Sequence, residues 1–186
     1  MSSMIVLKRR IKSVKSTRQI TKAMELISAS KMRKASEATL ASRYYAEVAQ
    51  NILQHLKDSQ NTRFHRLYRR DTIKARLHIV ITSNRGLSGA YNKNVLQQFT
   101  AHLKEDAEAL VKSKAILIGR QAGRFASHIQ GLEVLGLYDA LPERATVADM
   151  SPILATCVQQ FSTLEVDEVR VVYTRYVSNL VHAVDK

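Results

Sequence analysis

The turn Arg85-Gly86-Leu87-Ser88-Gly89 has residue types that could bind an anion. It follows an apolar stretch and precedes an amphipathic one, which is where α/β folds hold phosphate groups. Its spacing matches neither the dinucleotide fingerprint nor the Walker A loop, because no Lys-Ser/Thr follows. A tight turn that needs two permissive residues is therefore favoured over an anion cradle assisted by Arg85. The turn at 119–123 has the same interpretation.

The other polar residues carry no signature of catalysis. The six histidines are scattered without an HxxxH or HxH pair, so we expect no metal site. The carboxylates at 105–108 and 165–168 are explained better by solvation of a helix surface and a strand entry than by acid–base chemistry. Cys157 lies among apolar residues, which predicts a buried, unreactive thiol in a reducing compartment. We expect a non-enzyme with no cofactor.

Charge divides the chain into two parts. The net charge is +13, and residues 1–76 hold 18 Lys and Arg against 5 Asp and Glu, whereas residues 77–186 hold 11 of each. This asymmetry predicts that a basic N-terminal arm meets an acidic partner, which could be nucleic acid, an anionic membrane or an acidic protein surface.

The basic arm is predicted to be one long helix. Residues 7–56 contain no Pro or Gly, and at about 1.5 Å per residue they would span roughly 75 Å. A seam with 3–4 spacing, typical of a coiled coil, runs through positions 24, 31, 38, 45 and 52 and through 27, 34, 41 and 48. Much of this seam is small, so a partner helix could approach closely. We expect the half from 36 to 56 to be packed and the first half to project, with a linker at 58–75.

Three functions remain open for the arm at this point. Nucleic-acid binding is weakened because the first 43 residues have no aromatic side chain for base stacking. A membrane-surface helix needs a wider bulky apolar face. A coiled-coil shaft against an acidic protein uses both the seam and the charge, while a solvated basic face without a specific role is the remaining interpretation. No apolar run is long enough to span a bilayer. The basic, Ser-containing start resembles a transit peptide, but the helical pattern continues unbroken beyond any cleavage point, which favours a structural helix.

From residue 76 the pattern alternates between strand and helix. Apolar strands are expected at 76–83, 114–119, 132–138 and 168–178. Helices are expected in between, the last at 146–161 with Pro152 near its start. Strand–helix alternation with short turns predicts a parallel α/β sheet.

Four segments together resemble the gamma subunit of rotary ATP synthases: IKSVKSTRQITKAMELISASKMRKA (11–35), SRYYAEV (42–48), ITSNRGLSGAYN (81–92) and VRVVYTRYVS (169–178). The first is long and specific, and the four occur in the family's order. Asn84 and Ser88 depart from the acidic residue and the Cys that the family often has there. Family members also continue beyond this length into a C-terminal helix that coils antiparallel to the first, so we expect a fragment or a shortened gene product.

The resemblance implies an α/β fold in which a long N-terminal coiled-coil helix (1–57, the shaft) is joined by a linker (58–75) to a Rossmann-like α/β domain with a mainly parallel sheet (76–186, the foot). It implies a non-catalytic rotor subunit that couples proton-driven rotation to ATP synthesis or hydrolysis. The implied partners are the alpha and beta subunits, epsilon and the c-ring, at the cytoplasmic face of a bacterial plasma membrane. A basic-helix nucleic-acid-binding protein is the alternative.

The resemblance also implies contacts residue by residue. Met24, Lys31, Arg33 and Lys34 would pass the acidic C-terminal lever of the beta subunits. Arg9, Lys12 and Lys15 would lie nearer the inner end of the shaft, in the collar of the hexamer. No catalytic, cofactor-binding or metal-ligating residue is implied.

Overall fold

The computed structural model describes residues 2–57, 65–68, 72–139, 141–142, 145–178 and 182–185. The chain forms two compact units, Met1–Arg69 and Arg70–Lys186. The linker expected at 58–75 falls largely outside the described residues, although a short 3-10 helix, η2 (Arg66–Tyr68), lies within it. The boundaries 1–57, 58–75 and 76–186 therefore stay a prediction.

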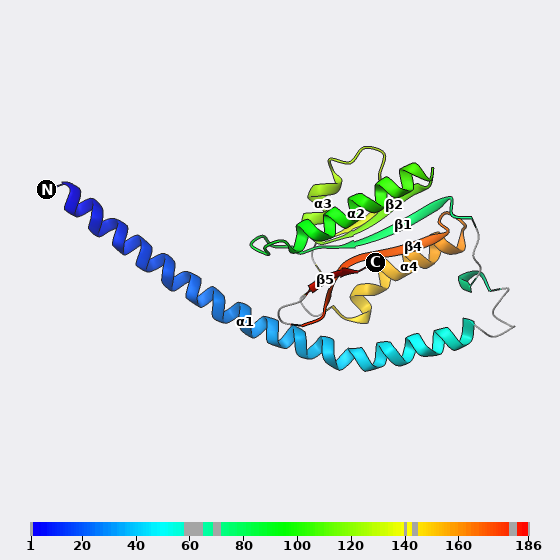
Figure 1. The fold of residues 1–186 in the computed structure, drawn as a ribbon, viewed down its shortest axis with the longest axis horizontal. Coiled ribbons are helices and arrows are strands. Elements are labelled where there is room, and N and C mark those ends of the chain that lie inside the picture. Colours follow the sequence, from blue (N-terminus) through cyan, green and yellow to red (C-terminus); the bar gives the residue numbers. More distant parts are fainter. Residues whose placement is uncertain are drawn as a thin grey trace. The chain divides into compact units, whose positions relative to one another are not determined.

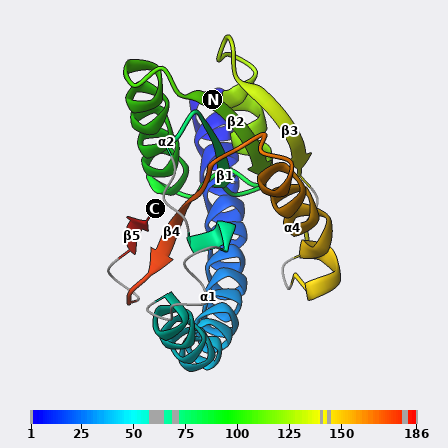
Figure 2. The ribbon, with the colours of Figure 1, turned by 90° about the vertical axis from the view of Figure 1, so that its right-hand side faces the viewer.

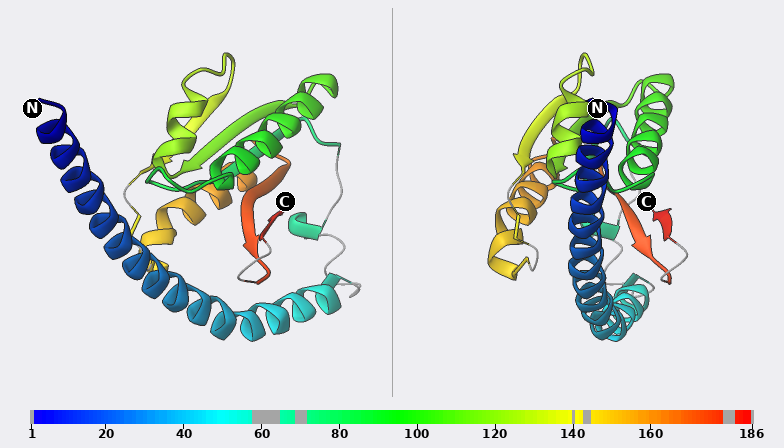
Figure 3. Two further views of the ribbon diagram at one scale, coloured as in Figure 1. Left: turned by 60° about the vertical axis from the view of Figure 1, so that its left-hand side comes forward. Right: turned by 90° about the vertical axis from the view of Figure 1, so that its left-hand side faces the viewer.

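The first unit is dominated by one helix, α1 (Ser2–Lys57), of 56 residues. Figure 3 shows it as a single continuous, gently curved ribbon. Without Gly or Pro, nothing in the sequence ends it early. Two threonines bond back along it: the Thr21 hydroxyl donates to the Thr17 carbonyl at 3.0 Å, and the Thr39 hydroxyl donates to the Ala35 carbonyl at 2.9 Å. Such bonds satisfy the hydroxyls inside a helix and are associated with bending.

The surface of α1 is open along its length. From residue 3 to residue 57, every side chain is exposed except the partly covered Ser36 and Ala49. The expectation that the half from 36 to 56 is packed is wrong for the described residues, since Tyr44 and Tyr45 are 77% and 79% exposed. One helix cannot cover its own seam, so packing of these side chains requires a second element.

The second unit is an α/β fold (Figure 1). Its sheet has the order β3-β2-β1-β4-β5. The first four strands are parallel, and β5 runs antiparallel to β4. This confirms the α/β class with a mainly parallel sheet, while β5 was not expected from the sequence. The elements are β1 (Ala75–Ile81), α2 (Tyr91–Glu108), β2 (Lys112–Ile118), α3 (Arg120–Ala126), β3 (Glu133–Tyr138), α4 (Val147–Ser162), β4 (Glu168–Tyr176) and β5 (His182–Asp185).

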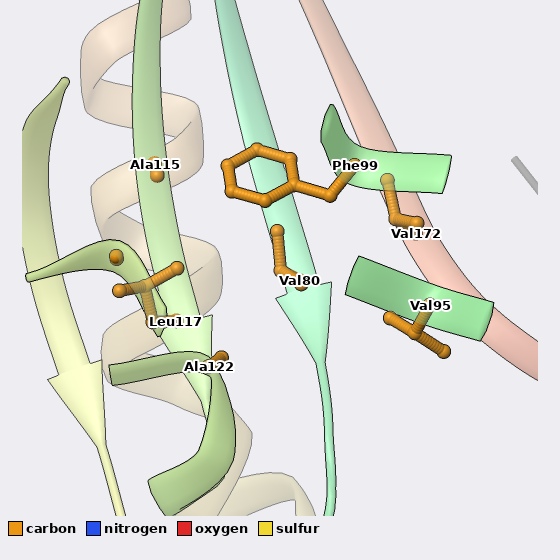
Figure 4. Close-up of a cluster of buried hydrophobic side chains, with 8 residues drawn as sticks. Val80, Val95, Phe99, Ala115, Leu117, Ala122 and Val172 are labelled. Atoms are coloured by element: carbon orange, nitrogen blue, oxygen red, sulfur yellow. The ribbon is translucent and has the colours of Figure 1, made fainter. Parts of the chain in front are cut away.

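Helices cover both faces of the sheet, with α2 and α4 on opposite sides (Figure 2). Alternate residues of β1 divide between the two faces: Val80 packs with Phe99 of α2, and Leu77 packs with Ile153 of α4. A strand buried on both faces reads as a continuous apolar run, which is why β1 was predictable. Figure 4 shows the α2 side of the core, where Phe99 and Val95 lie beside Val80 and Val172.

The start of α4 is fixed by a capping box. The Thr146 hydroxyl accepts from the Asp149 backbone N–H, and the Asp149 carboxylate accepts from the Thr146 backbone N–H. These two bonds satisfy donors that a helix start otherwise leaves unpaired. Pro152 lies inside the helix, five residues after its first residue Val147, as the sequence suggested. The α4 helix then presents Ile153 and Cys157 to the sheet.

Candidate functional site

The first half of α1 is a band of positive charge without internal compensation. Seven Lys and Arg residues precede Glu25, which is the first acidic residue of the chain. Further along, ion pairs do form within the helix: Lys22 Nζ lies 3.0 Å from Glu25 and Arg33 Nε lies 3.1 Å from Glu37. Before residue 22 no carboxylate lies within the one-turn spacing that such pairs need. The charge there is available to another molecule.

The structure places all seven predicted contact residues on α1, in two separate bands. Arg9, Lys12 and Lys15 are exposed and follow one another at three-residue spacing, so they share one side of the helix. Met24 and the cations at 31–34 form the second band. Lys15 and Lys31 are separated by sixteen residues, or about 24 Å along the axis. One small partner surface cannot contact both bands.

Within the second band the residues divide between two faces. Met24, Lys31 and Lys34 are spaced by seven and three residues, which places them on one stripe. Arg33 is two residues from Lys31, and positions two apart on a helix do not face the same way. Met24 is 48% exposed, and the Arg33 side chain is 83% exposed. A flat partner surface that touches Lys31 therefore does not touch Arg33.

The glycine turn after β1 is held together by its own side chains. The Asn92 carboxamide accepts from the Ser83 backbone N–H at 3.0 Å, and its amide group donates to the hydroxyls of Ser83 and Ser88 at 2.8 Å. Gly89 has a φ of 57° and Leu87 a φ of 60°, so the turn needs left-handed backbone at two positions. These contacts support the interpretation as a tight turn.

The second turn, at 119–123, is also closed by the chain itself. The first three backbone N–H groups of α3 donate to Asn84 Oδ1 at 3.1 Å, to the Ser83 carbonyl at 3.4 Å and to Thr82 Oγ1 at 2.9 Å. An anion at this end would have to displace bonds already made. The carboxyl ends of β1 and β2 thus fasten the sheet to α3.

Sequence reasoning missed a buried ionic cluster between α2 and the sheet. Asp106, expected to be a solvated helix-surface carboxylate, is 1% exposed. It pairs with the Arg76 guanidinium and accepts from His78 Nε2 and from the Ser113 hydroxyl, both at 2.8 Å. The expectation for Asp106 is wrong, because its position one turn after the buried His102 places it on the sheet-facing side of α2.

The cluster continues onto β4. Glu168 lies 2.8 Å from Arg76 and 2.9 Å from Arg170, and Arg170 lies 3.3 Å from Glu105. Burial alone would raise the pKa of Glu168, but the hydrogen bonds from Arg170 and Arg76 outweigh it and hold that pKa below its usual value. The same carboxylates raise the pKa of Arg170 against the effect of burial. The sequence signals that could have revealed this cluster are the charged or titratable residues at alternate positions, 76 and 78 on one strand and 168 and 170 on another.

The remaining expectations concern single groups. Cys157 is buried, as expected, and burial raises the pKa of its thiol, which keeps it unreactive. Among the described residues, no three His, Cys, Asp or Glu side chains gather closely enough to hold a metal ion. The helices in the described part of the chain include none with both the length and the apolar character needed to cross a bilayer.

Comparison with known proteins identifies the family. The family model described as ATP synthase matches residues 3–186. The ATP synthase gamma chains of Pelotomaculum thermopropionicum and Alkaliphilus metalliredigens are each 36% identical to this chain, over 181 and 176 residues. The chain belongs to the ATP synthase gamma chain family. The matched parts make up 97% and 95% of this gamma-family chain, but 62% and 59% of the two relatives. The chain thus spans about three fifths of their length.

A solved structure shares the fold of this gamma-family chain. It is the cryo-EM structure of the Tetrahymena thermophila mitochondrial ATP synthase, central stalk and c-ring. The match has a TM-score of 0.62 at 20% sequence identity and covers 89% of this chain and 70% of the other. The combination of a long helix with an α/β unit is therefore a known fold.

Proposed function

We propose that this chain is the central-stalk rotor subunit of an F-type ATP synthase and is not itself catalytic. The observation that carries the proposal is the family match, which runs through both units from residue 3 to residue 186. In this function, α1 is half of the rotor shaft inside the hexamer of alpha and beta subunits, where catalysis occurs. The α/β unit is the foot, in contact with epsilon and the c-ring.

The surface of α1 supports its assignment to a shaft. Eighteen of its large apolar side chains are exposed, far more than a monomer usually leaves on one helix. The small residues beside them, such as Ala35, Ser42 and Ala49, would allow a second helix to approach closely. That second helix would belong to the part of the gamma chains that this chain does not span. Its antiparallel packing would cover the apolar and small positions of the seam, while the long side chains of the seam cations Lys31 and Lys34 would extend past its edge.

The two bands of charge support contacts with acidic surfaces of the hexamer. Arg9, Lys12 and Lys15 would lie in the collar near the inner end of the shaft. Met24, Lys31 and Lys34 would pass the acidic lever of one beta subunit, while Arg33 faces another direction. Electrostatic attraction suits a sliding contact because it is long-ranged and tolerant of register. An asymmetric shaft would then impose different states on the three beta sites in turn, through differential contact.

The assembly would be peripheral to the membrane. Proton flow through the membrane-embedded part would turn the c-ring, the foot and the shaft together. In a bacterium this places the chain at the cytoplasmic face of the plasma membrane. The nucleic-acid alternative has no support from the comparisons, and the early part of α1 offers no aromatic side chain to stack on bases.

The contact assignment is tested by charge reversal on α1. Lys31→Glu combined with Arg33→Glu should weaken binding of the 186-residue chain to an alpha–beta hexamer about tenfold at low salt, because attraction becomes repulsion at the lever that meets Lys31 and at the different surface that meets Arg33. Binding is measured by co-elution and by titration. The matched control is Lys93→Glu with Lys104→Glu, which makes the same change of net charge at exposed positions of α2.

Each outcome of these binding measurements supports or refutes one part of the proposal. Equal binding of the double variant and the wild type would refute the lever contact. Failure of the wild-type chain to bind the hexamer would refute the proposal that this chain acts as a rotor subunit. The single variants separate the two faces: if Lys31 and Arg33 meet different beta subunits, each should contribute independently, and their effects should add. Tight binding to duplex DNA at physiological salt would instead favour the nucleic-acid alternative.

A further inference from the structure

The interface between α2 and the sheet has two chemically different halves. Toward the start of α2, Val95 and Phe99 pack on Val80 and Val172 in an apolar cluster (Figure 4). Toward its end, the sheet-facing positions are His102 and Asp106, and the facing strand residues are charged or titratable. A domain of this size needs no buried charges to hold a helix in place, and such clusters are seldom more stabilising than apolar packing. The ionic half therefore calls for a separate explanation.

His78 is the centre of the ionic half. It is fully buried on β1, its ring lies edge-on to Phe99 at 5.6 Å, and it stacks on His102 at 6.0 Å. Its Nε2 lies 2.8 Å from Asp106 Oδ2. A carboxylate can only accept, so Nε2 carries the proton in neutral His78 and Nδ1 does not. That Nδ1 is buried without a hydrogen-bond partner among the described residues.

Protonation of His78 would therefore place a new N–H where nothing accepts it. The charged groups around the ring are Arg76 on its own strand, Glu168 and Arg170 on β4, and His102, Glu105 and Asp106 on α2. On this face β2 contributes only the Ser113 hydroxyl. The pKa of His78 is lowered to about 4, mainly by burial and also by His102, Arg76 and Arg170, whose combined effect exceeds the opposite effect of Glu168.

We propose that the ionic half of this interface is an acid-sensitive latch, in which proton uptake by His78 releases the C-terminal half of α2 from the sheet while the Phe99 half stays docked. The released helix end would expose both imidazoles to water and separate His102 from the two arginines, which stay on the sheet beside His78. Asp106 would leave with the helix, and Arg76 would keep Glu168 as its partner on the sheet, 2.8 Å away. The latch is thus a property of the fold that is independent of the proposed rotor function.

The direction of the pH effect follows from linkage. The pKa of His78 is about 4 when docked and near its ordinary 6.5 when released, so the released form binds the proton more readily. Docking is at full strength above pH 6.5 and weakens as the pH falls, until the docked form also takes up the proton near pH 4. With these two values, the equilibrium shifts toward release by about 30-fold at pH 5 from His78 alone.

Hydrogen exchange of the 186-residue chain at pH 7 and pH 5 tests the latch. After correction for intrinsic exchange rates, amides at 102–108 should lose about 20-fold in protection between pH 7 and pH 5. Amides at 95–99 should lose less, and those of α4 on the opposite face should not change. Unchanged protection at 102–108 would overturn the proposal. An equal loss in α2 and α4 would also overturn it, because it would indicate global unfolding.

Substitution of the histidines identifies the proton acceptor. His78→Gln keeps an N–H that can donate to Asp106 but does not titrate in this range, so it should abolish most of the pH dependence at 102–108. His128→Gln, at an exposed position after α3, is the matched control and should behave as the wild type. A pH dependence that survives in His78→Gln would refute the assignment.

A second measurement decides the question if the His78 variants do not fold. NMR titration of the histidine ring protons of the wild-type chain should show one resonance, assigned to His78, that titrates well below pH 5.5. A titration of His78 at pH 6.5 or above would overturn the proposal.

Discussion

Basic side chains have opposite environments in the two units of this chain. In α1, Lys and Arg are exposed, and before Lys22 none of them has a carboxylate one turn away. In the α/β unit, Arg76 and Arg170 are paired with Asp106, Glu168 and Glu105 inside the interface between α2 and the sheet. The first arrangement leaves charge for another molecule, and the second uses charge to join elements of one molecule. Composition alone does not distinguish them.

The largest expected effect on stability is that of substituting Asp106 in the α/β unit. Asp106→Ala leaves His78 buried without its acceptor and Arg76 with Glu168 as its one described carboxylate partner, which should lower the free energy of unfolding of the α/β unit by about 3–5 kcal/mol. Urea denaturation followed by circular dichroism measures this free energy of unfolding. Glu108→Ala, two residues away and exposed, should stay within about 0.5 kcal/mol. Similar losses in both variants would show that the cluster is not a closed network.

A smaller but still clear loss of stability is expected on substitution of Gly119, where two backbone segments of the α/β unit lie close together. Its φ of 96° is unfavourable for any L residue, and a Cβ there would clash with the Thr82 carbonyl and lie 2.7 Å from Thr82 Oγ1. Gly119→Ala should lower the midpoint of thermal unfolding by an amount corresponding to about 2–3 kcal/mol. The control is Gly86→Ala, where no atom lies within 4 Å of the new Cβ. Equal midpoints for the two variants would contradict the described geometry.

The smallest effect on folding is expected in α1. Lys12→Ala removes an exposed cation from a helix in which Ala is at least as favourable, so the free energy of unfolding should change by less than about 0.5 kcal/mol. The same denaturation experiment measures this. Binding to an alpha–beta hexamer should nevertheless weaken at low salt, and the difference should shrink as salt is added. A loss of stability comparable to that of Asp106→Ala would erase the contrast between the two units.

Most of the fold could be predicted from local patterns. The absence of Gly and Pro predicted α1, and β1 was evident as an apolar run between turn residues. The strand β5 was missed because four residues, His182–Asp185, carry no period that separates a strand from a loop. The exposed second half of α1 was misjudged for a different reason: a seam in the sequence shows that a helix has a partner, not where that partner comes from.

The candidate site was predictable only in part. The seven residues of α1 were assigned by resemblance, and a helix fixes their relative directions once its continuity is known. The ionic cluster could not be predicted, because Arg76 and Glu168 are 92 residues apart and only the sheet register brings them together. Asp106 lies in the same acidic stretch of the sequence as the exposed Glu105 and Glu108. Burial of one and exposure of the others depend on which face of α2 meets the sheet.

The central position of β1 has a consequence for biosynthesis. One of its edges pairs with β2, which follows after a single helix, while the other waits for β4, whose Glu168 is 92 residues beyond Arg76. At about 5–20 residues per second, a ribosome needs roughly 5–20 s to make that stretch. During this interval an apolar strand has an open edge, which is a template for pairing with other chains. The nascent chain is therefore most exposed to aggregation in the seconds before its fourth strand emerges.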